Sequence, residues 1–149
     1  MARPPGEAVI GGLESLRQRH VLTLPTLPAA VRVARETAEQ VLAEWHIGPH
    51  HPSVGPALLI LAELVTNSVR HAAPVSAQLT VVYAARRDRL ALAVHDRHPY
   101  QPTLYGSAVG SADGGLATVM ELTLGLGGTA GVLPDPDGRG KTIRVCLPL

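Results

Sequence analysis

Aromatic residues are scarce in this chain. Its 149 residues include no phenylalanine, one tryptophan and three tyrosines. Because hydrophobic residues still make up 46% of the sequence, the core must be filled mainly by leucine, valine and alanine. Fifteen glycines and thirteen prolines indicate that much of the chain is loop. The length corresponds to a single domain, since one domain usually takes about 100–200 residues.

Three further absences exclude whole classes of protein. Cys146 is the only cysteine, so the sequence has neither an internal disulfide nor the spacing of a cysteine metal site. The longest apolar stretch near the N-terminus is residues 8–10, too short for a secretory signal or a membrane span, which predicts a cytoplasmic protein. Thirteen basic and twelve acidic side chains give a net charge of +1, too little for a protein whose main partner is nucleic acid.

The pattern of apolar residues predicts one α+β domain over residues 20–149, after a flexible tail over residues 1–19. Spacings of three and four predict a helix over 29–45 and another from Ser53, placed to cap it, to about Ala72. The period then changes to two, which predicts strands at 79–83 and 90–94 paired as an antiparallel hairpin. The other expected elements are a strand at 20–24, a weak helix at 115–123 and strands at 130–133 and 143–147. This order predicts a two-layer α/β sandwich, with helices on one face of a mixed, mostly antiparallel sheet.

The second helix carries polar residues within an otherwise apolar surface. Glu63 and Asn67 are four residues apart and share a face, and His71 follows one turn later. These can be ordinary surface residues of a helix. Because apolar residues surround Glu63 and Asn67, the alternative is that both side chains need partners and belong to a site.

Asp96 is the second candidate. It continues the inward-facing row of its strand, so its carboxylate is either an acidic turn residue or a partly buried acceptor for a ligand amine. The glycine-rich segment that follows leads into Gly114 and Gly115 at the start of a helix. The backbone N–H groups there can bind an anion.

Together these residues resemble a known family. The run Glu63-Leu64-Val65-Thr66-Asn67-Ser68-Val69-Arg70-His71-Ala72 is similar to the N box of the GHKL (Bergerat-fold) ATP-binding proteins, in the version of the bacterial anti-sigma-factor serine/threonine kinases. The resemblance covers about residues 20–149. It implies that ATP and Mg²⁺ are bound, with Asn67 on the Mg²⁺, Glu63 as catalytic base and Asp96 on the adenine amino group.

The resemblance assigns further roles near the nucleotide. Gly114, Gly115 and Leu116 match the end of the G2 box beside the phosphates, Thr142 in Gly140-Lys141-Thr142 lies near the adenine, and His71 completes the N box. It also implies a sigma factor and an anti-anti-sigma (STAS-type) protein as partners, and a possible homodimer. We expect neither a membrane nor nucleic acid among its direct partners.

The chain departs from the family pattern in the G1 and G2 boxes. Residues 96–100 read Asp-Arg-His-Pro-Tyr, without the usual glycines, and Asp113 stands where the G2 box has its first glycine. Residues 98–113 contain no lysine or arginine, so phosphates would depend on Mg²⁺ and backbone amides. Two hypotheses follow: a serine/threonine kinase that also sequesters a sigma factor, or a catalytically degenerate module of the same fold that acts through protein binding alone.

Other motifs are interpreted as structural. Residues 138–142 resemble the end of a P-loop, but Asp135 stands in place of the first glycine and a strand follows. His46, His50 and His51 lie in a loop without a companion ligand cluster. Cys146 lies in a strand pattern and is expected to be a packed side chain. A sensor histidine kinase needs a helical hairpin before this domain, and about 20 residues are too few to form one.

Overall fold

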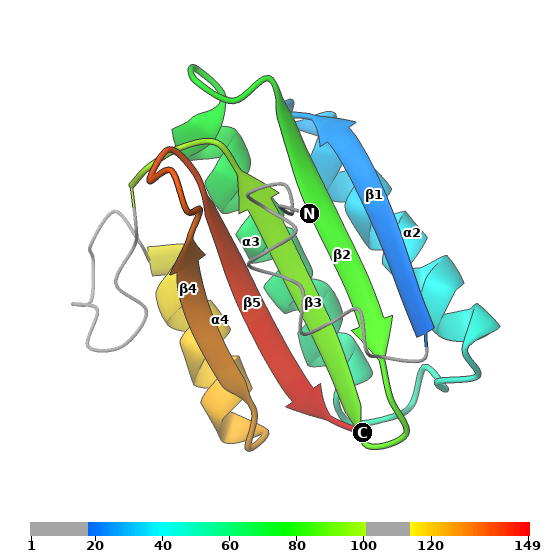
Figure 1. The fold of residues 1–149 in the computed structure, drawn as a ribbon. Helices are drawn as coiled ribbons and strands as arrows, with labels where there is room; N and C mark the ends of the chain where they lie inside the picture. Colours follow the sequence, from blue (N-terminus) through cyan, green and yellow to red (C-terminus); the bar gives the residue numbers. More distant parts are fainter. Residues whose placement is uncertain (1–17, 101–113) are drawn as a thin grey trace, which may run out of the picture.

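The computed structural model describes residues 18–100 and 114–149, which form three helices and five strands (Figure 1). The elements run in the order β1 (Gln18–Pro25), α2 (Ala29–Glu44), α3 (Val54–Ala72), β2 (Gln78–Ala85), β3 (Arg89–Asp96), α4 (Gly114–Gly125), β4 (Thr129–Pro134) and β5 (Lys141–Pro148). Each element expected from the sequence is present, with boundaries that differ by a few residues. In the described part of the chain, no helix is both long and apolar enough to cross a bilayer.

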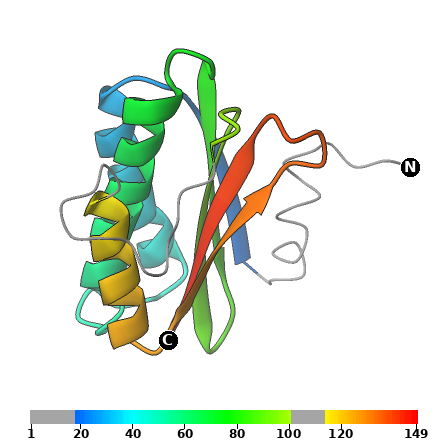
Figure 2. The same cartoon turned by 90° about the vertical axis from the view of Figure 1, so that its left-hand side faces the viewer.

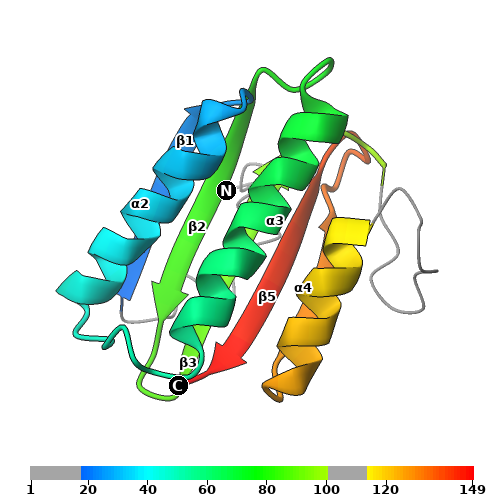
Figure 3. The ribbon, with the colours of Figure 1, turned by 180° about the vertical axis from the view of Figure 1, so that it is seen from behind.

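The five strands form one sheet in the order β1-β2-β3-β5-β4. All four pairings between these strands are antiparallel, so the expectation of a mixed sheet is wrong. The reason is that β5 turns back from β4 and inserts between β4 and β3, which separates the two strands that run in the same direction. All three helices cover the same face of the sheet (Figure 2) and lie side by side across it (Figure 3). The predicted α+β sandwich is thus confirmed.

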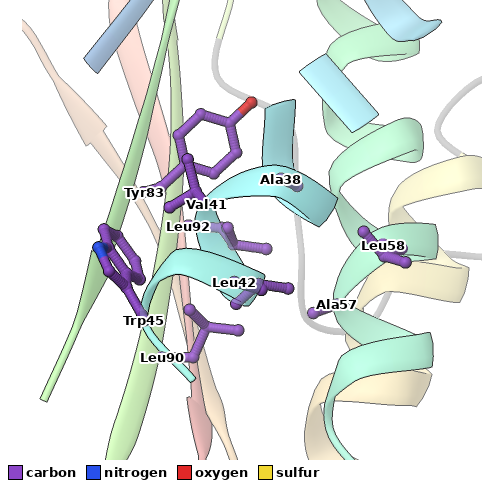
Figure 4. A pocket seen from close by; sticks show the side chains of 9 residues that line it. All are labelled: Ala38, Val41, Leu42, Trp45, Ala57, Leu58, Tyr83, Leu90 and Leu92. Carbon is purple, nitrogen blue, oxygen red and sulfur yellow. The ribbon is translucent and has the colours of Figure 1, made fainter. Parts of the chain in front are cut away.

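The core lies between the helices and the sheet. Leu90, Leu92 and Val94 alternate along β3 and face the helices, as their period of two predicts. The largest buried side chain there is Tyr83, whose hydroxyl donates a hydrogen bond of 2.6 Å to the Ala34 carbonyl. Figure 4 shows the small void beside it, between α2, α3 and the sheet. At about 10 Å³ this void is too small for a ligand.

Two local expectations differ from the structure. Strand β1 begins at Gln18, two residues before the expected start of the domain, so the last two residues of the predicted tail over residues 1–19 belong to this strand, and residues 1–17 lie outside the described residues. Ser53 does not cap α3: its hydroxyl donates instead to the Pro148 carbonyl at 2.6 Å. The hydroxyl therefore ties the start of α3 to the end of β5.

The sheet face opposite the helices has small side chains. Val82, Ala84, Ala91 and Ala93 cluster there, and Cys146 packs against them. Cys146 is a free, half-buried thiol, as expected for a packed strand residue. On β5, Thr142 and Arg144 alternate with the core residues and share this opposite face.

Candidate functional site

The polar face of α3 points toward the start of α4. Glu63 and Asn67 are both half-buried, and no described residue forms a hydrogen bond or ion pair with either side chain. His71, one turn further, is half-buried as well. Two oxygen-bearing side chains one turn apart, both without a partner, are free to bind a ligand or a hydrated cation.

Gly115 explains how α4 can approach this face so closely. A side-chain methyl group at this position would overlap the carboxylate of Glu63. The first turn of α4 therefore lies directly against Glu63. Gly114 begins the same helix. The first backbone N–H groups of a helix have no partner within the helix and attract anions.

Leu116 is only 1% exposed and its side chain belongs to the apolar core. Any contact between Leu116 and a ligand would therefore have to use its backbone. Asp113, which the sequence analysis placed where the G2 box has a glycine, lies outside the described residues, as do residues 101–112 of the segment before it.

Asp96 ends β3 and is 1% exposed. The sequence predicted a carboxylate that waits for a donor, but the chain itself supplies three. Lys141 Nζ lies 2.7 Å from Oδ1, the His98 backbone N–H donates to the same oxygen at 3.0 Å, and Ser68 Oγ donates to Oδ2 at 2.7 Å. A carboxylate has about four lone-pair sites, so three of them are used here.

The structure does not bring Thr142 to this carboxylate. Its neighbour Lys141 occupies that place, because Lys141 alternates with Ile143 and Val145 on the helix side of β5. The Thr142 hydroxyl faces the other side, where it is fully buried and has no hydrogen-bond partner among the described residues. The same alternation, read from Leu147 back to Lys141, could have identified the lysine from the sequence.

A second ionic cluster lies beside the first and includes Arg97. Arg97 binds Asp135 at 2.5 Å and Asp137 at 2.8 Å, and His95 Nε2 lies 2.8 Å from the Asp135 carboxylate. The Arg97 hydrogen bond lowers the pKa of Asp137, and the same bond raises the pKa of Arg97. Arg97, the one cation at the base of the predicted phosphate segment, is thus already paired.

Gly140 lets the cluster around Asp96 and the cluster around Asp135 lie side by side. A methyl group there would overlap the Asp135 carboxylate and the Asp96 carbonyl oxygen. The turn before it follows the sequence signal, since the Gly138 N–H donates to the Asp135 carbonyl at 2.9 Å and Gly138 has a φ of 73°. The described residues contain no group of three or more histidine, cysteine, aspartate or glutamate side chains that could hold a metal.

No family model matches the sequence, and no curated protein does so either. Solved structures do match. The mycobacterial sensor histidine kinase MprB superposes with a TM-score of 0.53 at 16% identity, over 87% of this chain and 97% of that one. The histidine kinase domain of the blue-light activated histidine kinase EL346 from Erythrobacter litoralis also gives 0.53 at 16%, over 95% and 73% of the two chains.

A third match is the Acinetobacter baumannii histidine kinase AdeS, with a TM-score of 0.52 and 15% identity over 93% of this chain and 72% of that one. At such identities the likeness shows the fold. The chain shares its α+β sandwich fold with these three histidine kinase structures, and each match includes most of both chains.

Proposed function

We propose that this chain binds Mg²⁺–ATP between α3 and α4 and transfers the γ-phosphoryl group to a serine or threonine hydroxyl of a partner protein. The single observation that carries the proposal is the close approach of Gly115 to Glu63, one helical turn before Asn67. The start of α4 lies against the Glu63 carboxylate, and neither Glu63 nor Asn67, both half-buried, has a partner among the described residues. The fold shared with histidine kinase domains supports a nucleotide there.

The residues present suit a magnesium nucleotide. Mg²⁺ usually keeps several waters and takes one or two protein oxygens together with phosphate oxygens, so the Asn67 amide oxygen is a sufficient protein ligand. The backbone N–H groups of Gly114 and Gly115 would bind phosphate oxygens. This division of work fits a site in which Arg97, at the base of the segment before α4, is paired with Asp135 and Asp137.

Glu63 would act on the attacking hydroxyl. As the hydroxyl oxygen bonds to the γ-phosphorus, the bond from the γ-phosphorus to the bridging oxygen breaks, ADP leaves, and Glu63 accepts the hydroxyl proton. Positioning and charge neutralisation account for most of such a transfer, so few side chains suffice. By its resemblance to anti-sigma-factor kinases, we infer that the chain sequesters a sigma factor in the cytoplasm and phosphorylates a STAS-type antagonist.

A second candidate is favoured by Asp96. Its carboxylate is engaged by Lys141, Ser68 and the His98 N–H, which leaves little capacity for an adenine amino group. In this candidate the domain keeps the fold and binds a partner protein without phosphotransfer. The buried ion pair of Lys141 and Asp96 would then take the place that the adenine base occupies in a nucleotide-binding domain.

A phosphotransfer assay separates the two candidates. The chain is incubated with γ-labelled Mg²⁺–ATP and candidate STAS-domain proteins, and label on serine or threonine is measured. We expect transfer by the wild type and a loss of at least about 100-fold for Glu63→Gln, since a positioned general base contributes about 10²–10⁴-fold.

The control is Gln40→Ala, which removes an exposed amide from α2 and should leave transfer unchanged. Transfer that survives Glu63→Gln would contradict the role of Glu63. Complete absence of transfer, with a sigma factor still bound, would favour the second candidate.

A further inference from the structure

A second cavity lies at the other end of α3 from Asn67. It measures about 550 Å³ and lies between the loop that joins α2 to α3 and the turn that joins β2 to β3. In Figure 1 both connections are at the lower end of the sheet, whereas β3 ends at the upper end. The cavity is therefore separate from the proposed nucleotide site, and the inference does not depend on that proposal.

The side chains around this cavity are rich in hydrogen-bond donors. Arg86 and Arg87 come from the β2–β3 turn, His46 and His51 come from the α2–α3 loop, and no described lining residue has an acidic side chain. Both arginines are exposed, and neither is paired with a described carboxylate. Asp88 follows them in the turn but does not line the cavity. Two guanidinium groups complement an anion with two negative charges better than one with a single charge.

His51 is oriented as a donor. The Ser53 backbone N–H donates to His51 Nδ1 at 3.1 Å, so Nδ1 carries no proton. In the neutral ring the proton then lies on Nε2, which can donate to a ligand.

His46 stands where the backbone favours glycine. Helix α2 ends in a Schellman motif, in which the His46 N–H donates to the Ala43 carbonyl at 3.1 Å and the Ile47 N–H to the Leu42 carbonyl at 2.9 Å. His46 takes the left-handed position with a φ of 57°, and it is the only non-glycine residue with positive φ in the described chain. A side chain kept at an energetic cost beside a cavity indicates that the side chain has a use.

One wall of the cavity is apolar. Trp45 and Ile47 line it, and Trp45 is half-buried (Figure 4) beside the core void. An aromatic wall next to guanidinium groups suits a ligand that joins an anionic group to an apolar body. We propose that this cavity binds an organic phosphate monoester, with its phosphate on Arg86, Arg87 and His46 and its organic part on Trp45.

The protein contains a reporter for this proposal, because Trp45 is its only tryptophan. The full chain is titrated with phenyl phosphate, with inorganic phosphate and with benzyl alcohol while tryptophan fluorescence is recorded. We expect a saturable change with phenyl phosphate, binding about tenfold weaker for inorganic phosphate, and none for benzyl alcohol. The absence of a saturable change with phenyl phosphate, or an equal response to benzyl alcohol, would overturn the proposal.

A matched pair of arginine variants sharpens the test. Arg87→Gln should weaken phenyl phosphate binding at least about tenfold, since a hydrogen bond to a charged group is worth about that factor. Arg89→Gln removes the same charge outside the cavity and should change the affinity less than about twofold.

His46→Gly should raise the melting temperature, because glycine relieves the left-handed backbone, and should weaken phenyl phosphate binding at the same time. Equal affinities for Arg87→Gln and Arg89→Gln, or a stabilised His46→Gly that binds as well as the wild type, would contradict the proposed site. The opposite signs of the two effects in His46→Gly exclude misfolding as the reason for weaker binding.

Discussion

Lys141 Nζ lies 2.7 Å from Asp96 Oδ1, and both side chains are 2% exposed. Burying two charges costs solvation free energy, which is recovered only where the geometry is good and the remaining polar atoms have partners. Ser68 and the His98 N–H supply such partners to the carboxylate. The pair therefore joins the end of β3 to the start of β5, and the Ser68 hydroxyl ties the C-terminal part of α3 to it.

Replacing one member of this pair should be costly. Lys141→Met leaves a buried carboxylate without its cation, and we expect the free energy of unfolding to fall by about 3–5 kcal/mol. Urea unfolding of the purified variant measures this loss. The double variant Asp96→Asn with Lys141→Met removes both charges and should recover at least half of it. A loss below about 1 kcal/mol in the single variant would contradict the buried pair.

Gly115 and Gly55 should respond differently to alanine. Gly55 lies in the first turns of α3 with open space around it, so Gly55→Ala should stabilise the domain by about 0.5–1 kcal/mol. At Gly115 the added methyl group must displace the Glu63 carboxylate, the mobile end of a side chain, so we expect little change in stability but strongly reduced phosphotransfer. Thermal melts and the transfer assay measure the two effects. Unchanged transfer in Gly115→Ala would show that Glu63 does not need its present position.

The Tyr83 hydroxyl makes the free energy of unfolding depend on pH in the alkaline range. Burial raises the pKa of Tyr83 above its usual value of 10.0, so the folded protein keeps a proton that the unfolded chain loses. The stabilisation is complete below about pH 10 and is lost as the pH rises above it, by about 1.4 kcal/mol per pH unit. Unfolding of the wild type and of Tyr83→Phe is measured between pH 9 and 11, about one unit on each side of the usual tyrosine pKa. The slopes of the unfolding free energy against pH are then compared between the two proteins. Equal slopes would contradict a buried, protonated Tyr83.

The Arg97 hydrogen bond to Asp137 should be visible in the titration of that carboxylate. Because the bond stabilises the charged form, the pKa of Asp137 lies below its usual value, and Arg97→Gln should raise it. NMR titration of the Asp137 carboxyl carbon in both proteins measures the shift. A pKa of Asp137 that is unchanged in Arg97→Gln would contradict this bond.

Most of the fold follows from periodicity. The apolar spacing of α3 and the alternation in β2 and β3 determine which faces meet, and these elements were predicted with the right type and near their observed ends. The antiparallel character of the whole sheet could not be predicted, because β5 inserts between β3 and β4, and the order of strands is not visible in alternation. Ser53 illustrates a second limit, since its distant acceptor, the Pro148 carbonyl, competes with the local cap.

The candidate site was predicted in part. Glu63 lies against Gly115, two residues that the family resemblance assigned to one site. Lys141 was missed because a charged residue at the start of a strand is normally exposed, and only its partner Asp96 makes burial possible. Thr142 was expected near the base of the nucleotide, yet its position one residue later directs it to the other face of the sheet.

The most direct test of the account is the stabilisation of the folded chain by Mg²⁺–ATP. With nucleotide at about 100 times its dissociation constant, the wild type should gain about 2.7 kcal/mol, and the gain should fall sharply when EDTA removes the metal. Asn67→Ala should lose most of this gain, whereas Gln40→Ala should keep it. A wild type that Mg²⁺–ATP does not stabilise, or an Asn67→Ala variant stabilised as much as the wild type, would contradict the proposed nucleotide site.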